Sequence, residues 1–243
     1  FKERTRANTV FFSLEKSADF QARDIEFMTE PLGMKFTLNT PDGDITINLP
    51  VLGTHQVANA VAAAATAWQI VSDKYQIKRG LESFKPAKMR MQIIPAGQIT
   101  LINDAYNANP KSLNSALDCL KQLYVKGRKV VVLGDMRELG EQSQAAHISA
   151  GVSIQKTGAE LLIAVGSMSE FVIEGAMSAG MNKNSLFACE TRDEALDYLK
   201  SALKDGDVVL LKASRKMEFE RLASSLEQWA GAGDLFSNQN LNH

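Results

Sequence analysis

The most constraining feature of the chain is a set of short, continuous apolar runs that alternate with helix-like segments in its second half. Residues 129–133 read Lys-Val-Val-Val-Leu, and residues 208–211 read Val-Val-Leu-Leu. A continuous apolar run of this length is typical of a strand buried on both faces, as in a parallel sheet covered by helices. Residues 112–123 instead carry apolar side chains three and four positions apart, which is the spacing of one helix face.

This alternation predicts an α/β fold with a doubly wound, mostly parallel sheet. We expect its strands near residues 93–96, 99–103, 129–133, 161–165, 186–188 and 207–212. We expect its helices near residues 111–124, 144–157, 168–180, 191–204 and 217–229.

The first half of the chain has a different pattern. Residues 34–40 and 45–49 alternate apolar and polar side chains around Pro41-Asp-Gly43, which predicts a β-hairpin. Residues 6–12 favour a further strand, and residues 55–71 and 77–84 favour helices. We therefore divide the chain into three parts. These are a first part over 1–85, a doubly wound domain over 86–230, and a flexible tail over 231–243.

Polar side chains gather where the expected strands end. Residues 103–110 read Asn-Asp-Ala-Tyr-Asn-Ala-Asn-Pro, in which Asn109 suits a helix N-cap and Pro110 the first helical position. Taken alone, capping would explain this turn as well as ligand binding would. Two further polar turns, at 134–140 and 212–215, also follow buried strands. Because parallel strands bring their carboxyl ends to one edge of a sheet, we expect a binding site there.

Four segments of this chain, in order, resemble the Mur ligases. They are Leu52-Gly-Thr-His-Gln-Val-Ala-Asn-Ala60, Asp104-Ala-Tyr-Asn-Ala-Asn-Pro110, Leu133-Gly-Asp-Met-Arg-Glu-Leu-Gly140 and Lys212-Ala-Ser-Arg215. The resemblance runs from about residue 9 to about residue 229. It implies the C-terminal part of the family's central ATP-binding domain, followed by the family's Rossmann-like C-terminal domain. Gln56, Met89 and Ala213 stand where the family has Asn, Gly and Gly.

The second and third motifs together resemble those family members that join D-alanyl-D-alanine to UDP-N-acetylmuramoyl-tripeptide. In this family Mg-ATP phosphorylates a substrate carboxylate, and the acceptor amine then attacks the acyl phosphate. The resemblance implies an ATP-dependent peptide ligase of peptidoglycan synthesis that uses these two molecules as substrates. Catalysis of this kind depends mainly on positioning and charge stabilisation, so the resemblance also implies domain closure about a hinge at 85–88.

The resemblance carries over to particular residues. It implies a catalytic role for Arg90, at the ATP phosphates. It implies nucleotide contacts for His55, Asn59, Arg90, Asp104, Tyr106, Asn107 and Asn109. The charges needed to bind a zwitterionic dipeptide predict an acceptor site made of Asp135, Glu138, Lys212, Ser214 and Arg215.

Several of these residues also have ordinary structural explanations. His55 could be a polar residue at the start of a helix, and Arg90 a solvated charge. Asn107 and Asn109 could serve the turn alone. His147 lies on an amphipathic helix beyond the third motif, where we favour a structural role over a catalytic one.

No Gly-x-x-x-x-Gly-Lys-Ser/Thr phosphate loop occurs in the sequence, and the chain begins with Phe1. We therefore expect the C-terminal portion of a longer enzyme, whose upstream part would hold most of the ATP and Mg²⁺. On its own, such a portion should fold without hydrolysing ATP.

The composition limits the classes of partner that we expect for this chain. With 27 basic and 28 acidic residues the net charge is −1, which gives no reason to expect nucleic acid. No segment is long and apolar enough for a membrane span, and the N-terminus is no signal peptide. Cys119 and Cys189 have no metal-ligand spacing and suggest no disulfide. We expect a cytoplasmic monomer without a metal site of its own.

Two alternatives stay open. A sister Mur-type ligase or a folylpolyglutamate ligase would share the nucleotide residues but not the third motif. A non-catalytic nucleotide-binding module could keep the fold without the phosphate loop.

Overall fold

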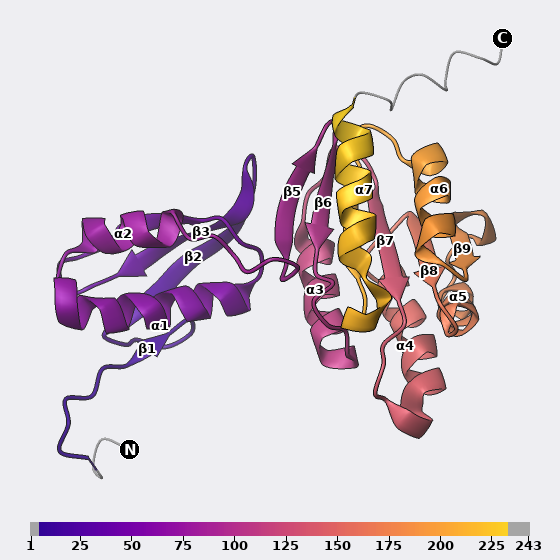
Figure 1. Cartoon of the computed structure of the whole chain (residues 1–243). Helices are drawn as coiled ribbons and strands as arrows, with labels where there is room; N and C mark the ends of the chain where they lie inside the picture. Colours follow the sequence, from indigo (N-terminus) through magenta and orange to yellow (C-terminus); the bar gives the residue numbers. More distant parts are fainter. Residues whose placement is uncertain (1–4, 233–243) are drawn as a thin grey trace. The chain divides into compact units, whose positions relative to one another are not determined.

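A computed structural model describes residues 5–232 of the chain (Figure 1). These residues form two compact units, the first ending at Pro86 and the second beginning at Ala87. Each unit has its own hydrophobic core. Most of the expected tail over 231–243 lies outside the described residues.

The first unit is built on a four-stranded sheet in the order β1-β2-β3-β4. The strands are β1 (Phe12–Ser13), β2 (Phe20–Thr29), β3 (Leu32–Asn39) and β4 (Ile45–Leu49). β3 and β4 pair antiparallel, which confirms the predicted hairpin. Its turn closes with a hydrogen bond from the Gly43 N–H to the Thr40 carbonyl, and Gly43 has the positive φ of 92° that favours glycine.

One expectation for this unit was wrong, and one strand was not anticipated. Residues 6–11 are not a strand, and only Phe12 and Ser13 pair with β2. At Phe11 the N–H donates to the Asp19 carboxylate rather than to a backbone carbonyl, while the Phe11 carbonyl accepts the Phe20 N–H. β2 was not anticipated, because the register shifts between Arg23 and Glu26 and Asp24 has a φ of 52°. A bulge of this kind interrupts the alternation that marks a strand in a sequence.

Two helices pack on this sheet, α1 (Thr54–Val71) and α2 (Lys74–Glu82), close to the predicted ranges. The apolar face of α1 contributes Val57, Val61 and Ala64 to the core, opposite Phe20 and Phe36 of the sheet. Gly53 precedes α1 with a φ of 104°.

The second unit contains a six-stranded sheet in the order β5-β6-β10-β7-β8-β9. The strands are β5 (Gln92–Ala96), β6 (Ile99–Asn103), β7 (Lys129–Gly134), β8 (Leu161–Val165), β9 (Leu186–Cys189) and β10 (Val208–Lys212). All pairs are parallel except β5 with β6. This confirms the mostly parallel sheet, in which β10, the last of these six strands in the sequence, lies between β6 and β7.

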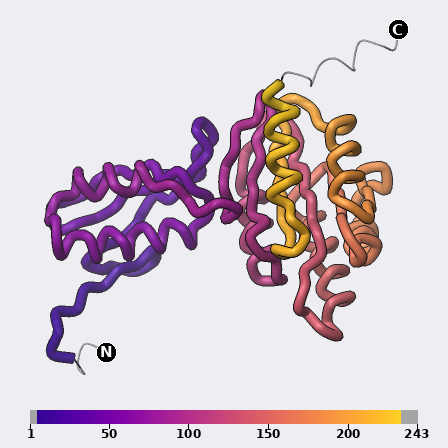
Figure 2. The backbone as a smooth tube through the Cα atoms, in the orientation of Figure 1, coloured from indigo at the N-terminus to yellow at the C-terminus, as the bar shows by residue number. Residues whose placement is uncertain are grey.

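Helices cover both faces of the second sheet (Figures 1 and 2). They are α3 (Pro110–Gln122), α4 (Ser143–Gln155), α5 (Ser169–Ser178), α6 (Arg192–Ala202) and α7 (Phe219–Gly231). α6 and α7 contact each other, and α4 contacts both α3 and α5. Val130 and Val132 point into the core shared with α6 and α7, while their neighbour Val131 is equally buried on the other face. Among residues 5–232, no helix combines the length and apolarity needed to cross a membrane.

Candidate functional site

The three polar turns predicted from the sequence follow β6, β10 and β7, which are adjacent strands of the second sheet. Because these strands are parallel, their carboxyl ends lie at one edge. The structure therefore brings Asp104, Asp135 and Lys212 to the same edge, as expected. Their burial separates them into two groups.

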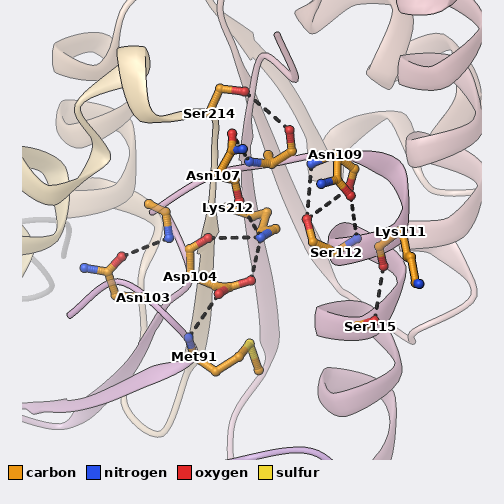
Figure 3. Close-up of polar contacts among 12 residues, drawn as sticks. Met91, Asn103, Asp104, Asn107, Asn109, Lys111, Ser112, Ser115, Lys212 and Ser214 are labelled. Atoms are coloured by element: carbon orange, nitrogen blue, oxygen red, sulfur yellow. Dashed lines mark hydrogen bonds and ion pairs between the residues drawn. The ribbon is translucent and has the colours of Figure 1, made fainter. Parts of the chain in front are cut away.

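Lys212 is the most deeply buried charge at this edge, with 2% of its surface exposed. Its ammonium lies 2.6 Å from Asp104 Oδ2 and donates to the carbonyls of Asn107, at 2.7 Å, and Asp104, at 3.2 Å (Figure 3). An ammonium has three hydrogens to donate, and here each has an acceptor. Lys212 thus holds the turn after β6 from inside the protein.

Asp104 links that turn to the segment preceding β5. Its second carboxylate oxygen, Oδ1, accepts the Met91 N–H at 3.0 Å (Figure 3). Farther along the turn, Asn109 Oδ1 accepts the Ser112 N–H at 2.9 Å, and Ser112 Oγ accepts the Asn109 N–H at 3.1 Å. This confirms that Asn109 caps α3, with Pro110 at the first helical position.

Ser214 and Asp135 connect the remaining turns, and each is only 4% exposed. Ser214 Oγ accepts the Arg137 N–H at 2.8 Å and lies 3.5 Å from the Ala108 carbonyl. The Asp135 carboxylate accepts three bonds from the loop after β8, from the N–H and Oγ of Ser167 and the N–H of Met168. We call Asp104, Asp135, Lys212 and Ser214 the framework residues, because each of them ties together segments distant in sequence.

His147 is buried beneath the same turn. Its Nε2 lies 2.9 Å from the Met136 N–H, and its Nδ1 lies 2.7 Å from the Ser143 carbonyl. Nε2 must be unprotonated to accept from Met136, so the ring is the neutral tautomer with hydrogen on Nδ1. These contacts agree with the structural role expected for His147.

A second group of side chains at this edge is exposed. It comprises Arg90, Tyr106, Asn107, Glu138 and Arg215. The Arg90 guanidinium lies over the Tyr106 ring, 4.3 Å from its centroid. Arg215 forms an ion pair with Glu220 at 2.9 Å. At the start of α7, the hydrogen bond from Arg192 holds the pKa of Glu218 below its usual range.

Two pockets lie among the predicted site residues. One, of about 220 Å³, is lined by the turns after β7 and β8, including Asp135, Glu138 and Ser167. The other belongs to the first unit, has a volume of about 250 Å³, and is mainly apolar. Its lining residues are Leu49, Val51, Gln56, Asn59, Ala60, Ala63, Leu81 and Phe84.

The two polar groups of the apolar pocket are amides on α1. Asn59 Nδ2 donates to Gln56 Oε1 at 3.3 Å. His55 is exposed in the first turn of α1 and is not among the lining residues. His55 and Asn59 thus belong to the first unit, and all other predicted site residues belong to the second.

The sequence analysis did not single out Met91, Arg137 or Ser167, although all three contribute to the edge of the second sheet. Only Ser167 carried a signal. It follows Gly166 after a buried strand, so it occupies a fourth strand end of the kind already chosen.

Comparisons with known proteins decide the family. The model of the Mur ligase glutamate ligase domain matches residues 89–215, and that of the Mur ligase middle domain matches residues 1–67. The chain belongs to the Mur ligase family. The UDP-N-acetylmuramoyl-tripeptide–D-alanyl-D-alanine ligase of Bacillus subtilis is 32% identical over 209 residues, which cover 86% of this chain and 45% of that protein.

Solved Mur ligase structures agree with this. A crystal structure of MurF from Acinetobacter baumannii has a TM-score of 0.78 and 32% identity, over 90% of this chain and 47% of that one. MurF from Thermotoga maritima, crystallised with ADP, has a TM-score of 0.73 at 22% identity, over 93% of this chain and 50% of that one, and supports the fold alone. The chain spans about half the length of the relatives it matches.

Within residues 5–232, no group of three or more His, Cys, Asp or Glu side chains is arranged to hold a metal ion. Cys119 and Cys189 are separate buried thiols, and burial raises the pKa of Cys119 to about 11.

Proposed function

We propose that this chain belongs to an ATP-dependent ligase that joins D-alanyl-D-alanine to UDP-N-acetylmuramoyl-tripeptide through an acyl phosphate. The observation that carries the proposal is the match to ligases of this name over nearly nine tenths of the chain, at about one third identity. The third motif supports the same choice, because together with the second motif it resembles the members that use D-alanyl-D-alanine.

For the nucleotide, we propose contacts in each unit. The apolar pocket with its Gln56 and Asn59 amides suits the adenine ring, which needs flat apolar surroundings and a few hydrogen-bonding groups. His55 would lie near its rim. In the second unit, Arg90 would contact the phosphates, where a guanidinium can form paired hydrogen bonds with phosphoryl oxygens.

The turn after β6 would serve the rest of the nucleotide. We propose that the carboxylate of Asp104, which lies at the end of β6 and bonds to Met91 and Lys212, also accepts a ribose hydroxyl, as carboxylates at strand ends do in nucleotide-binding folds. Tyr106 and Asn107 are exposed beside it, and Asn109 shapes the turn by capping α3.

For the acceptor, we propose that Glu138 binds the dipeptide ammonium and Arg215 its carboxylate. Both side chains are exposed. Asp135, Lys212 and Ser214 support this site from beneath, since their polar atoms already bond to the turns. We propose no Mg²⁺ ligand among the residues of this acceptor site.

The test is a chimera in which this chain replaces the matching residues of the Bacillus subtilis relative. We expect phosphate release from ATP that requires both the tripeptide and D-alanyl-D-alanine, with the ligated product identified by mass spectrometry. The chain alone should release none, because it has no phosphate loop. A folded chimera that prefers a single amino acid as acceptor would favour a sister ligase. One that binds nucleotide without any acceptor-dependent turnover would favour a non-catalytic module.

A further inference from the structure

The backbone around Arg90 is unusual. Met89 and Met91, the residues on either side, have φ values of 61° and 49°. Residues other than glycine rarely adopt this left-handed region, at a cost of about 1 kcal/mol or more each. Such a conformation persists only where neighbouring groups stabilise it, so we next identify the groups that contact residues 89–91.

The turn after β6 holds both flanking residues. The Tyr106 N–H donates to the Met89 carbonyl at 3.0 Å, and the Met91 N–H donates to Asp104 Oδ1, also at 3.0 Å. Gln92 adds a third bond, accepting the Met89 N–H at 3.1 Å. The Met91 side chain is buried. The backbone of residues 89–91 is therefore fixed to the turn on both sides of Arg90.

The same turn also holds the Arg90 side chain. The guanidinium carbon lies 4.3 Å from the centroid of the Tyr106 ring, which is 47% exposed. Stacking uses the face of the guanidinium and leaves its N–H groups, which lie in the plane, able to donate to an anion. Arginine has many rotamers when free, so a fixed one lowers the entropy lost on binding.

Lys212 fixes the turn in its own place. Its bonds to Asp104 and Asn107 come from β10 at the centre of the sheet. A continuous set of contacts thus runs from the centre of the sheet through Asp104 and Tyr106 to Arg90.

We propose that Asp104 and Tyr106 are positioning residues that seat Arg90, Asp104 through the Met91 backbone and Tyr106 through its own backbone and ring. The seat presents a preorganised guanidinium to a polyphosphate. The identity of that ligand rests on the proposed function, whereas the seat itself does not.

The experiment uses the full chain, with arginine side chains labelled for NMR and the Arg90 signals identified from Arg90→Lys. In the wild type, the Tyr106 ring current should move the Arg90 side-chain protons upfield. Tyr106→Phe should keep this shift and Tyr106→Leu should abolish it, with melting temperature checked for each. Tyr124→Leu removes another exposed tyrosine and is the matched control. Absence of the upfield shift in the wild type, or its persistence in Tyr106→Leu, would overturn the seat.

A titration with inorganic tripolyphosphate tests whether the seated Arg90 binds phosphate groups, independently of whether the seat exists. We expect the Arg90 signals to respond, with affinity about two- to fivefold weaker in Tyr106→Leu and unchanged in Tyr106→Phe, because without the ring the side chain must be ordered when the ligand binds. Equal affinity in the wild type and Tyr106→Leu would contradict preorganisation. A wild-type chain with the ring-current shift but no response to tripolyphosphate would support the seat and remove the phosphate role from the proposed function.

Discussion

The framework residues and the exposed side chains occupy the same edge of one sheet, but they differ in what they bond to. Lys212, Asp135 and Ser214 are almost fully buried, and their polar atoms bond to other turns of the protein. Arg90, Glu138 and Arg215 are exposed at the same strand ends. The side chains at these strand ends therefore fall into two groups. The buried ones hold neighbouring turns together, and the exposed ones can contact a ligand.

The largest expected effect comes from Lys212→Met, which keeps the apolar stem and removes the ammonium. Asp104 and two carbonyls would lose their shared donor. We expect a loss of about 3 kcal/mol in the unfolding free energy, at the low end for a broken buried ion pair, because Asp104 retains some contact with water. Urea unfolding measures it, and Lys216→Met is the exposed control, expected within about 0.5 kcal/mol of the wild type. Equal losses in both variants would erase the distinction between framework and exposed residues.

Arg90→Ala should show the opposite behaviour. We expect turnover in the chimera to fall about a hundredfold or more, since a lost charged hydrogen-bond donor costs roughly 2–4 kcal/mol in the transition state. The unfolding free energy should fall by only about 1 kcal/mol, for the contact with Tyr106. Steady-state kinetics and urea unfolding of the same preparations check both halves. Wild-type turnover would remove Arg90 from the proposed site.

Asp135→Asn sharpens the comparison within a single turn. An amide offers one acceptor oxygen in place of two, and its NH₂ group would face an N–H or O–H of the loop after β8. We expect a loss of about 2 kcal/mol in stability. Hydrogen exchange should also become faster at the Ser167 and Met168 amides.

Glu138→Gln, an exposed change in the same turn, should leave stability within about 0.5 kcal/mol of the wild type. Slow exchange at Ser167 and Met168 in Asp135→Asn would show that the carboxylate does not hold that loop.

Arg215→Ala should have a small effect on folding, about 1 kcal/mol or less, because the arginine of its pair with Glu220 is 55% exposed and Glu220 35%. In the chimera we expect the KM for D-alanyl-D-alanine to rise about tenfold with the KM for ATP unchanged, since the lost contact is with the acceptor. Varying each substrate in turn measures both constants. A parallel rise in both would mean that this arginine does not serve the acceptor specifically.

The sequence predicted the positions of the strand ends well, for a physical reason. A continuous apolar run such as residues 129–133 is typical of a strand that is covered on both faces, as in a parallel sheet. Adjacent parallel strands end at the same edge, so the turns after β6, β7 and β10 lie together. The helix cap at Asn109 could be predicted because its hydrogen bonds are to Ser112, only three residues along the chain.

The sequence did not show which of the charged side chains are buried. Lys212 and Arg215 are neighbours in one short motif, yet one is enclosed and the other is exposed. The difference depends on acceptors at Asp104 and Asn107, more than 100 positions away. β2 was missed because its bulge near Asp24 breaks the alternation of side chains. The Arg90 seat likewise depends on positive φ angles at Met89 and Met91, which cannot be predicted from these residue types.

β10 follows the other five strands of the second sheet in the sequence, yet it lies between β6 and β7. Until residues 208–212 have left the ribosome, each of those strands lacks a partner on one side, and the turn after β6 lacks its ammonium. Unpaired strand edges are surfaces on which unfinished chains aggregate. The nascent second unit therefore has two open strand edges until residues 208–212 are translated, and β10 then pairs with both of them.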